Sequence, residues 1–293
     1  MKKLNVIINA DDLGMSDTVN EAIERAICVG CISSSTIMAN APAFNDVIRI
    51  VKQYPQISFG VHLNVDEFTP LSNTDIFRKY NILDDAGQFK KEVLHGFSRI
   101  EEDLVSAIYE EWKAQLDKVF AAGIVPSHVD SHEYTHGIIE LQNALINLLN
   151  EYGIKKVRRK AYTSIPEMIV NRGVGTNTIS NDSNSPAPQL TGPQLNNSFF
   201  YRRLIQLKDG YKHRLWIQKM RKEGFILTDF FDSYQMFMNA YPKLLKYGCY
   251  RTVELMAHPG HHGYQKETEF LMQKKLADVC QYELINYKDL WLR

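Results

Sequence analysis

The sequence predicts an α/β protein with a (β/α)-barrel-like fold in a single domain. Short apolar runs rich in β-branched residues alternate with longer stretches of helical period. Eight such runs occur, as in a (β/α) barrel. Acids and histidines follow several of them, where parallel α/β folds collect their ligand-binding groups. The predicted strands cover residues 4–9, 32–38, 57–63, 124–129, 154–158, 225–228, 252–257 and 283–286.

The first predicted helix shows the alternation clearly. Thr18 and Glu21 have capping-box spacing, and apolar residues recur at helical spacing over 19–27. Gly30 is expected to end this helix, and Gly153 to end another that begins near Ile138. Both helices directly follow a segment of acids or histidines.

No internal repeat or linker divides the chain, so one domain over residues 1–293 is predicted, with a variable loop or lid at about 171–224. Residues 171–198 are rich in Asn, Ser, Thr, Gly and Pro, as in a long loop. The basic stretch after them predicts the solvated face of a surface helix, with an electropositive wall beside the pocket as the alternative.

Charge and composition narrow the choice of partner. Thirty-four basic residues balance thirty-four acidic ones, so no net field attracts nucleic acid or an anionic membrane. No segment approaches the roughly 20 apolar residues of a membrane span. Four cysteines in 293 residues fit a reducing compartment, and the CxxC of Cys28 and Cys31 is interpreted as structural. We therefore expect a cytoplasmic protein that acts on a small molecule. The sequence leaves open whether the protein forms a homodimer.

Three distant segments carry the predicted chemistry: NADDLG at 9–14, GVHLN at 60–64 and HVDSH at 128–132. One carboxylate and two neutral imidazoles commonly hold a divalent ion while leaving positions for water and substrate. The candidate ligands are Asp12, His62 and His128. His128 is preferred because it comes first in HVDSH, nearest the predicted strand.

The remaining polar residues of these segments receive other roles. Asp130 and His132 are expected to orient an imidazole or to contact substrate. Asp11 is the candidate general base, with a cap or turn residue as the alternative. Because neighbours on a regular strand point to opposite faces, Asp11 and Asp12 can share one site only if their strand ends near Asn9.

A fourth segment, AHPG at residues 257–260, also follows a predicted strand. Its His258 is the candidate proton donor or oxyanion stabiliser for hydrolysis of an amide or ester. His261 and His262 follow closely and leave that assignment open.

The ordered segments NADDLG, VNEAI, SSSTIMANAPAF, GVHLN, HVDSHEYTH, GFILTDFF and ELMAHPG resemble the YdjC-like carbohydrate deacetylases, which include chitooligosaccharide deacetylase. The resemblance implies a (β/α)-barrel-like fold and metal-dependent removal of acetyl from an N-acetylated sugar, by default chitobiose or another N-acetylglucosamine oligomer. It implies one divalent ion, for which we expect magnesium or zinc, although the candidate ligands also suit manganese and cobalt. By motif it implies the ligands Asp12, His62 and His128, the base Asp11 and the acid His258.

The chain departs from the family pattern at three places, one of which is the 171–198 loop, which has no counterpart there. Tyr134 stands where a further histidine is expected, and HPGHH is unusual after the last motif. Two other functions stay open. A metal-dependent phosphoesterase or isomerase could use Arg158, Arg159 and Lys160 as a clamp, and a non-catalytic carbohydrate-binding relative would keep the fold without turnover.

Overall fold

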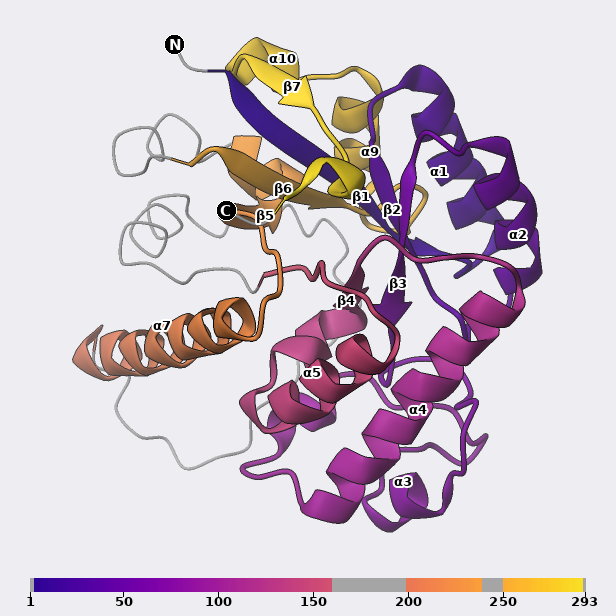
Figure 1. The fold of residues 1–293 in the computed structure, drawn as a ribbon, viewed down its shortest axis with the longest axis vertical. Helices are drawn as coiled ribbons and strands as arrows, with labels where there is room; N and C mark the ends of the chain where they lie inside the picture. Colours follow the sequence, from indigo (N-terminus) through magenta and orange to yellow (C-terminus); the bar gives the residue numbers. More distant parts are fainter. Residues whose placement is uncertain (1–2, 160–198, 239–249, 292–293) are drawn as a thin grey trace.

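The computed structural model describes residues 3–159, 199–238 and 250–291 (Figure 1). Its centre is a seven-stranded parallel sheet in the order β4-β3-β2-β1-β6-β5, with β7 paired to the start of β1. The strands are β1 (Leu4–Leu13), β2 (Ser34–Ile37), β3 (Ser58–Leu63), β4 (Val129–Ser131), β5 (Phe230–Ser233), β6 (Thr252–Ala257) and β7 (Tyr282–Leu284).

Helices flank this sheet, with α1 and α2 on one side and α7 at the opposite side of the view (Figure 1). The α-helices are α1 (Asp17–Val29), α2 (Phe44–Gln53), α3 (Asp75–Lys79), α4 (Glu102–Ala121), α5 (Gln142–Glu151), α7 (Phe199–Lys222), α9 (Gln265–Met272) and α10 (Leu276–Val279). Short 3₁₀ helices are η1 (Leu94–Gly96), η2 (His132–Gly137), η3 (Ile139–Leu141) and η4 (Tyr287–Asp289).

Two isolated parallel bridges continue the curve of the sheet beyond β4. Val129 bridges to Val157, and Lys156 bridges to Ile226, shortly before β5 begins at Phe230. The parallel strands therefore curve round from β5 through β1 to β4 and back towards β5. This confirms the predicted α/β, barrel-like fold.

Some predicted boundaries are wrong. The strand predicted over 124–129 is displaced to Val129–Ser131, because Pro126 cannot donate to a sheet ladder and Val125 is exposed. The segments predicted as strands at 154–158 and 225–228 form only the isolated bridges. Of the predicted loop or lid, residues 171–198 lie outside the described residues, whereas α7 is a helix, as expected of the basic stretch.

Helix α1 is capped differently from the prediction. Ser16 is the N-cap, and its side chain accepts a hydrogen bond from the Val19 amide, so Thr18 lies inside the helix. Gly30 ends the helix in the left-handed conformation, as predicted.

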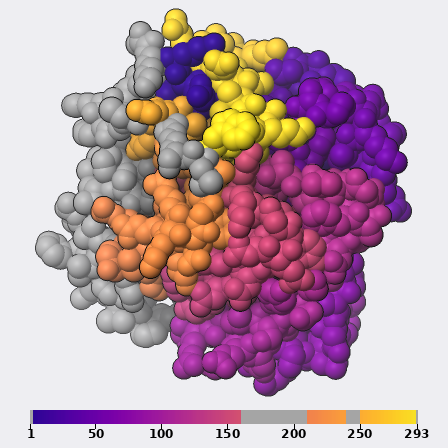
Figure 2. Space-filling model, in the orientation of Figure 1, coloured from indigo at the N-terminus to yellow at the C-terminus, as the bar shows by residue number. Residues whose placement is uncertain are grey.

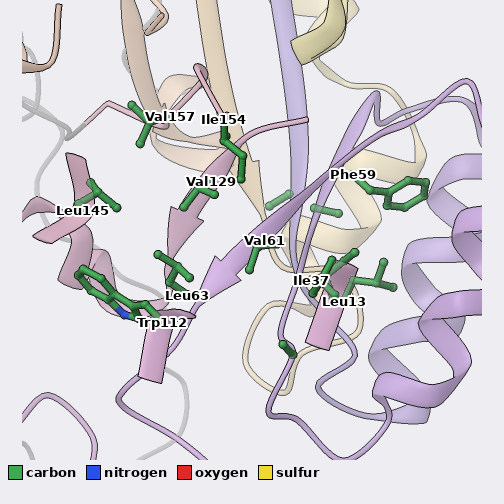
Figure 3. Close-up of a cluster of buried hydrophobic side chains, with 14 of the residues drawn as sticks. Leu13, Ile37, Phe59, Val61, Leu63, Trp112, Val129, Leu145, Ile154 and Val157 are labelled. Atoms are coloured by element: carbon green, nitrogen blue, oxygen red, sulfur yellow. The ribbon is translucent and has the colours of Figure 1, made fainter. Parts of the chain in front are cut away.

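A continuous apolar cluster fills the space between the sheet and its helices. Figure 3 shows part of it, where Val61, Leu63 and Val129 of β3 and β4 lie among side chains such as Trp112 of α4 and Leu145 of α5. In Figure 2 the C-terminal residues, in yellow, lie against the N-terminal ones, in indigo, as the pairing of β7 with β1 requires. Among the described residues no helix has the length and apolarity needed to cross a bilayer.

His128 precedes β4 and is enclosed in this interior. Its ring stacks on Tyr287 with centroids 3.6 Å apart, and its Nδ1 lies 2.8 Å from the Ser127 hydroxyl. A Cβ added to Gly60 of β3 would lie 2.5 Å from the His128 ring. The imidazole therefore fits between β3 and Tyr287 only because Gly60 has no side chain.

We expect Gly60→Ala to lower the free energy of unfolding by about 1–3 kcal/mol, the usual cost of overpacking, because Tyr287 prevents the ring from moving away. Urea unfolding measures the change. The matched control is Gly96→Ala, since a Cβ at Gly96 meets nothing within 4 Å. Equal midpoints for the two variants would contradict this account.

Candidate active site

A bulge at the end of β1 brings two adjacent acids to one site. The register of β1 against β2 shifts between Ala10 and Leu13, and Asp12 has a φ of 69°. The sequence predicts that both acids can share one site only if the strand ends near Asn9. The strand instead continues to Leu13 and is bulged. Ligand atoms of Asp11 and of Asp12 each lie within 4.8 Å of His62.

The described residues contain two clusters of acids and histidines. The first consists of Asp12, His62 and His132, whose ligand atoms lie within 4.8 Å of one another. The Asp12 Oδ1 atom lies 3.2 Å from His62 Nε2 and 3.1 Å from His132 Nδ1. Burial alone would raise the pKa of Asp12, but the surrounding imidazoles hold it well below its usual value. One anionic oxygen thus faces two ring nitrogens.

Carboxylates behind the two imidazoles fix their orientation. His62 Nδ1 donates to Asp130 Oδ1 at 2.6 Å, which leaves Nε2 to face Asp12. His132 Nε2 lies 3.8 Å from Glu67 Oε2, on the far side of the ring from Asp12. Burial lowers the pKa of His62, but Asp130 and Asp12 raise it well above the usual value. The surroundings of His62 therefore favour a positive charge, of the kind a divalent ion supplies.

His128 belongs to neither of the clusters found among the described residues. It lies immediately before β4, whereas His132 follows the carboxyl end of that strand. Burial and the nearby Arg158 lower the pKa of His128 well below its usual value. The displaced strand boundary thus puts His132, rather than His128, beside Asp12 and His62.

The second cluster, Asp11, His62 and Asp130, is closed by a guanidinium. Arg158 donates two hydrogen bonds of 2.7 Å to Asp11, and it also lies 2.7 Å from Asp130 and from Glu254. Burial raises the pKa of Asp11, but Arg158 outweighs it and lowers that pKa to about 2. Asp11 is therefore ionised and fixed in direction at neutral pH.

The phosphate clamp considered from the sequence finds no support in these contacts. Arg158 is buried and paired with three carboxylates. Arg159 donates to the Asp229 carbonyl, and Lys160 lies outside the described residues.

His258 follows β6 and is held from behind by Glu267 of α9. The Glu267 carboxylate accepts a hydrogen bond from the His258 amide and lies 3.5 Å from its Nδ1. Burial lowers the pKa of His258, but Glu267, Asp11 and Asp12 raise it to about 9. The structure thus provides a protonated imidazole within the electrostatic reach of both acids.

Three site features escaped the sequence analysis. The sequence predicts His132 only as an orienting or substrate residue and Arg158 only as part of a clamp, and it assigns no separate role to His261. His261 Nε2 lies 2.9 Å from Asp12 Oδ2. The unusual HPGHH sequence was the one signal that pointed to it.

A family model described as YdjC-like protein matches residues 5–282. The chain belongs to the YdjC-like family. A carbohydrate deacetylase of Halalkalibacterium halodurans is 35% identical over 141 residues, covering 45% of this chain and 54% of that relative. One of Thermoanaerobacter pseudethanolicus is 28% identical over 149 residues, covering 51% of this chain and 58% of the relative. The matched part thus spans little more than half of each relative.

A solved structure from Enterococcus faecalis V583 superposes with a TM-score of 0.67 at 18% identity, over 98% of both chains. This likeness concerns the fold and agrees with the barrel-like architecture described above.

We expect His132→Ala to raise the dissociation constant for a divalent ion by more than about 100-fold. This exceeds the loss typical of a residue that only contacts a metal ligand. His128→Gln should leave that constant nearly unchanged, although it disturbs the packing on Tyr287. Titration of chelator-stripped protein with zinc and with magnesium measures both. The reverse order of the two effects would restore His128 as the ligand.

We expect Arg158→Met to lower the free energy of unfolding by about 3–5 kcal/mol, because it leaves buried carboxylates without their counter-charge. Urea unfolding measures the change. Arg49→Met is the control, since Arg49 pairs with Glu24 and Asp46 on the surface, and its midpoint should hardly move.

The same contact predicts a pH dependence. The pKa of Asp11 is lower in the folded protein, about 2, than its ordinary value of 3.8. Its stabilisation is therefore complete above pH 3.8 and is lost as the pH falls towards 2. Asp11→Asn should remove this part of the acid transition, and an unchanged transition would contradict the assignment.

Proposed function

We propose that this chain is a metal-dependent deacetylase that hydrolyses the acetamido group of an N-acetylated sugar. The observation that carries the proposal is that two adjacent acids have different partners. Asp12 faces His62 and His132, whereas Asp11 is held beside them by Arg158. Relatives with the name carbohydrate deacetylase support the choice of substrate.

The donor set fits a divalent ion. Asp12 Oδ1, His62 Nε2 and His132 Nδ1 supply one oxygen and two nitrogens, a set suited to zinc and acceptable to magnesium. Asp12 Oδ2 is buried, and beyond its 2.9 Å approach to His261 Nε2 it makes no hydrogen bond with the described residues. When bound there, the ion would lower the pKa of water to roughly 7 and polarise the acetyl carbonyl.

Asp11 is the proposed general base. It takes a proton from the water that attacks the acetyl carbon, and the fork of Arg158 keeps its carboxylate aimed and ionised. Its low pKa makes it a weak base, so the water would need to be acidified by an ion held at the neighbouring site.

His258 is the proposed general acid. With a pKa raised to about 9 by Glu267 and the two acids, it is protonated at neutral pH. It gives this proton to the sugar nitrogen as the carbon–nitrogen bond breaks, and the products are acetate and a free amine. Deprotonation of His258 would lower activity above about pH 9.

The default substrate is chitobiose or another N-acetylglucosamine oligomer. We place the reaction in the cytoplasm, in keeping with the free thiols of Cys28, Cys31 and Cys280.

We expect acetate release from N,N′-diacetylchitobiose only after chelator-stripped protein is reloaded with zinc or magnesium. Asp11→Asn should lower the turnover number by about 10² to 10⁴, as expected for loss of a general base, while metal still binds. Asp46→Asn, a change to a surface partner of Arg49, is the matched control. Coupled enzymatic detection of acetate follows the reaction.

Two results would contradict this proposal. Equal sugar binding by the wild type and Asp11→Asn, with no acetate from either, would indicate the non-catalytic relative. Hydrolysis of p-nitrophenyl phosphate by metal-loaded protein that leaves N-acetyl sugars intact would indicate a phosphoesterase.

A further inference from the structure

His261 stands on the opposite side of the Asp12 carboxylate from the proposed ligand histidines. Asp12 Oδ1 faces His62 and His132, whereas Asp12 Oδ2 faces His261 Nε2 at 2.9 Å. Asp12 is almost completely buried, and beyond this 2.9 Å contact neither Oδ2 nor His261 Nε2 makes a hydrogen bond with the described residues. The second oxygen of the central carboxylate thus faces the His261 ring.

We infer that His261 is a positioning residue of the metal site, which holds the Asp12 carboxylate so that its other oxygen faces the ion. The inference rests on the metal centre of the proposed function and adds a residue to it. His261 is not itself assigned as a ligand. His261 belongs to neither cluster of the described residues, so its ring nitrogens do not lie within 4.8 Å of every ligand atom in either one. Ligands of one small ion lie closer together than this.

The backbone of Asp12 explains why its carboxylate needs a second restraint. Asp12 sits in the bulge of β1 with a φ of 69°, where the regular ladder with β2 is interrupted. A carboxylate held at one oxygen can still rotate about its terminal bond. Contact at Oδ2 removes this freedom, and outer partners of this kind commonly strengthen metal binding by 10–100-fold.

The loop that carries His261 is built to hold it in place. A Cβ on Gly260 would lie 2.8 Å from the Thr18 carbonyl oxygen and 2.8 Å from the Ala22 Cβ, so only glycine allows the loop to press against α1. The His261 amide donates to the His258 carbonyl, and the His261 carbonyl accepts from the Tyr264 amide. His261 is therefore anchored between the proposed acid and the start of α9.

The test measures metal affinity and needs no sugar substrate. We expect His261→Ala to raise the dissociation constant for zinc by about 10-fold or more. Competition with a chromophoric chelator measures this constant. His261→Gln should recover most of the loss, because its side-chain amide can donate to Asp12 Oδ2. His262→Ala should match the wild type, since His262 is the exposed neighbour in the same loop.

A spectroscopic measurement separates a positioning role from direct ligation. The visible spectrum of cobalt-loaded His261→Gln should match that of the wild type, because the donor atoms around the ion stay the same. A changed spectrum would assign His261 as a ligand and overturn the inference.

The affinity series can also overturn it. His261→Ala with wild-type affinity, equal losses in His261→Ala and His261→Gln, or an equal loss in His262→Ala would each reject the positioning role. A wild-type chain that binds neither zinc nor magnesium would reject the metal centre and the inference together. Wild-type protein that binds zinc but releases no acetate would reject only the proposed function.

Discussion

The buried side chain of Arg158 is the contact on which the rest of the site depends. Its guanidinium pairs with Asp11, Asp130 and Glu254, which come from β1, β4 and β6. Like charges buried so close together would repel one another without a central cation. Burial lowers the pKa of Arg158, but the three carboxylates raise it well above its usual value, so the cation is permanent. One residue thereby ties three strands together at the end where the chemistry is proposed.

The bulge of β1 gives two adjacent acids different surroundings. Asp11 faces Arg158, whereas Asp12 faces imidazoles. On a regular strand one of the two would point away from the site. The irregular strand end thus allows a dipeptide to supply both a fixed carboxylate and a candidate ligand for an ion. The same logic explains the choice of glycine at Gly60 and Gly260, where neighbouring groups leave no room for a Cβ.

The sequence predicted the architecture and the clustering of acids and histidines at one site. It did not predict which of these residues contact one another. Alternating periods and the cap at Gly30 are local signals, and they predicted the fold and the end of α1. The choice between His128 and His132 depended on the boundary of one short strand, which begins at Val129. Because β4 is displaced towards the C-terminus of the chain, His128 precedes the strand and His132 follows its carboxyl end. Propensity does not fix boundaries so finely, because tertiary contacts decide them.

The role of Arg158 was beyond local reasoning for another reason. Its contacts with Asp11 and Glu254 join residues 147 and 96 positions apart. A basic residue after an apolar run is usually a solvated surface group, so neither its burial nor its partners follow from the sequence. His261 poses the same difficulty, since its neighbour Asp12 lies at the other end of the chain.

The distribution of charge connects these contacts to the proposed ion. The chain is neutral as a whole, yet Asp11, Asp12, Asp130 and Glu254 are all buried around the site. Arg158 supplies one compensating charge, and the raised pKa values of His62 and His132 show where further positive charge is favoured. A divalent ion would satisfy the same demand with both imidazoles neutral. Ion binding should therefore release protons, and acid should compete with the ion for this site.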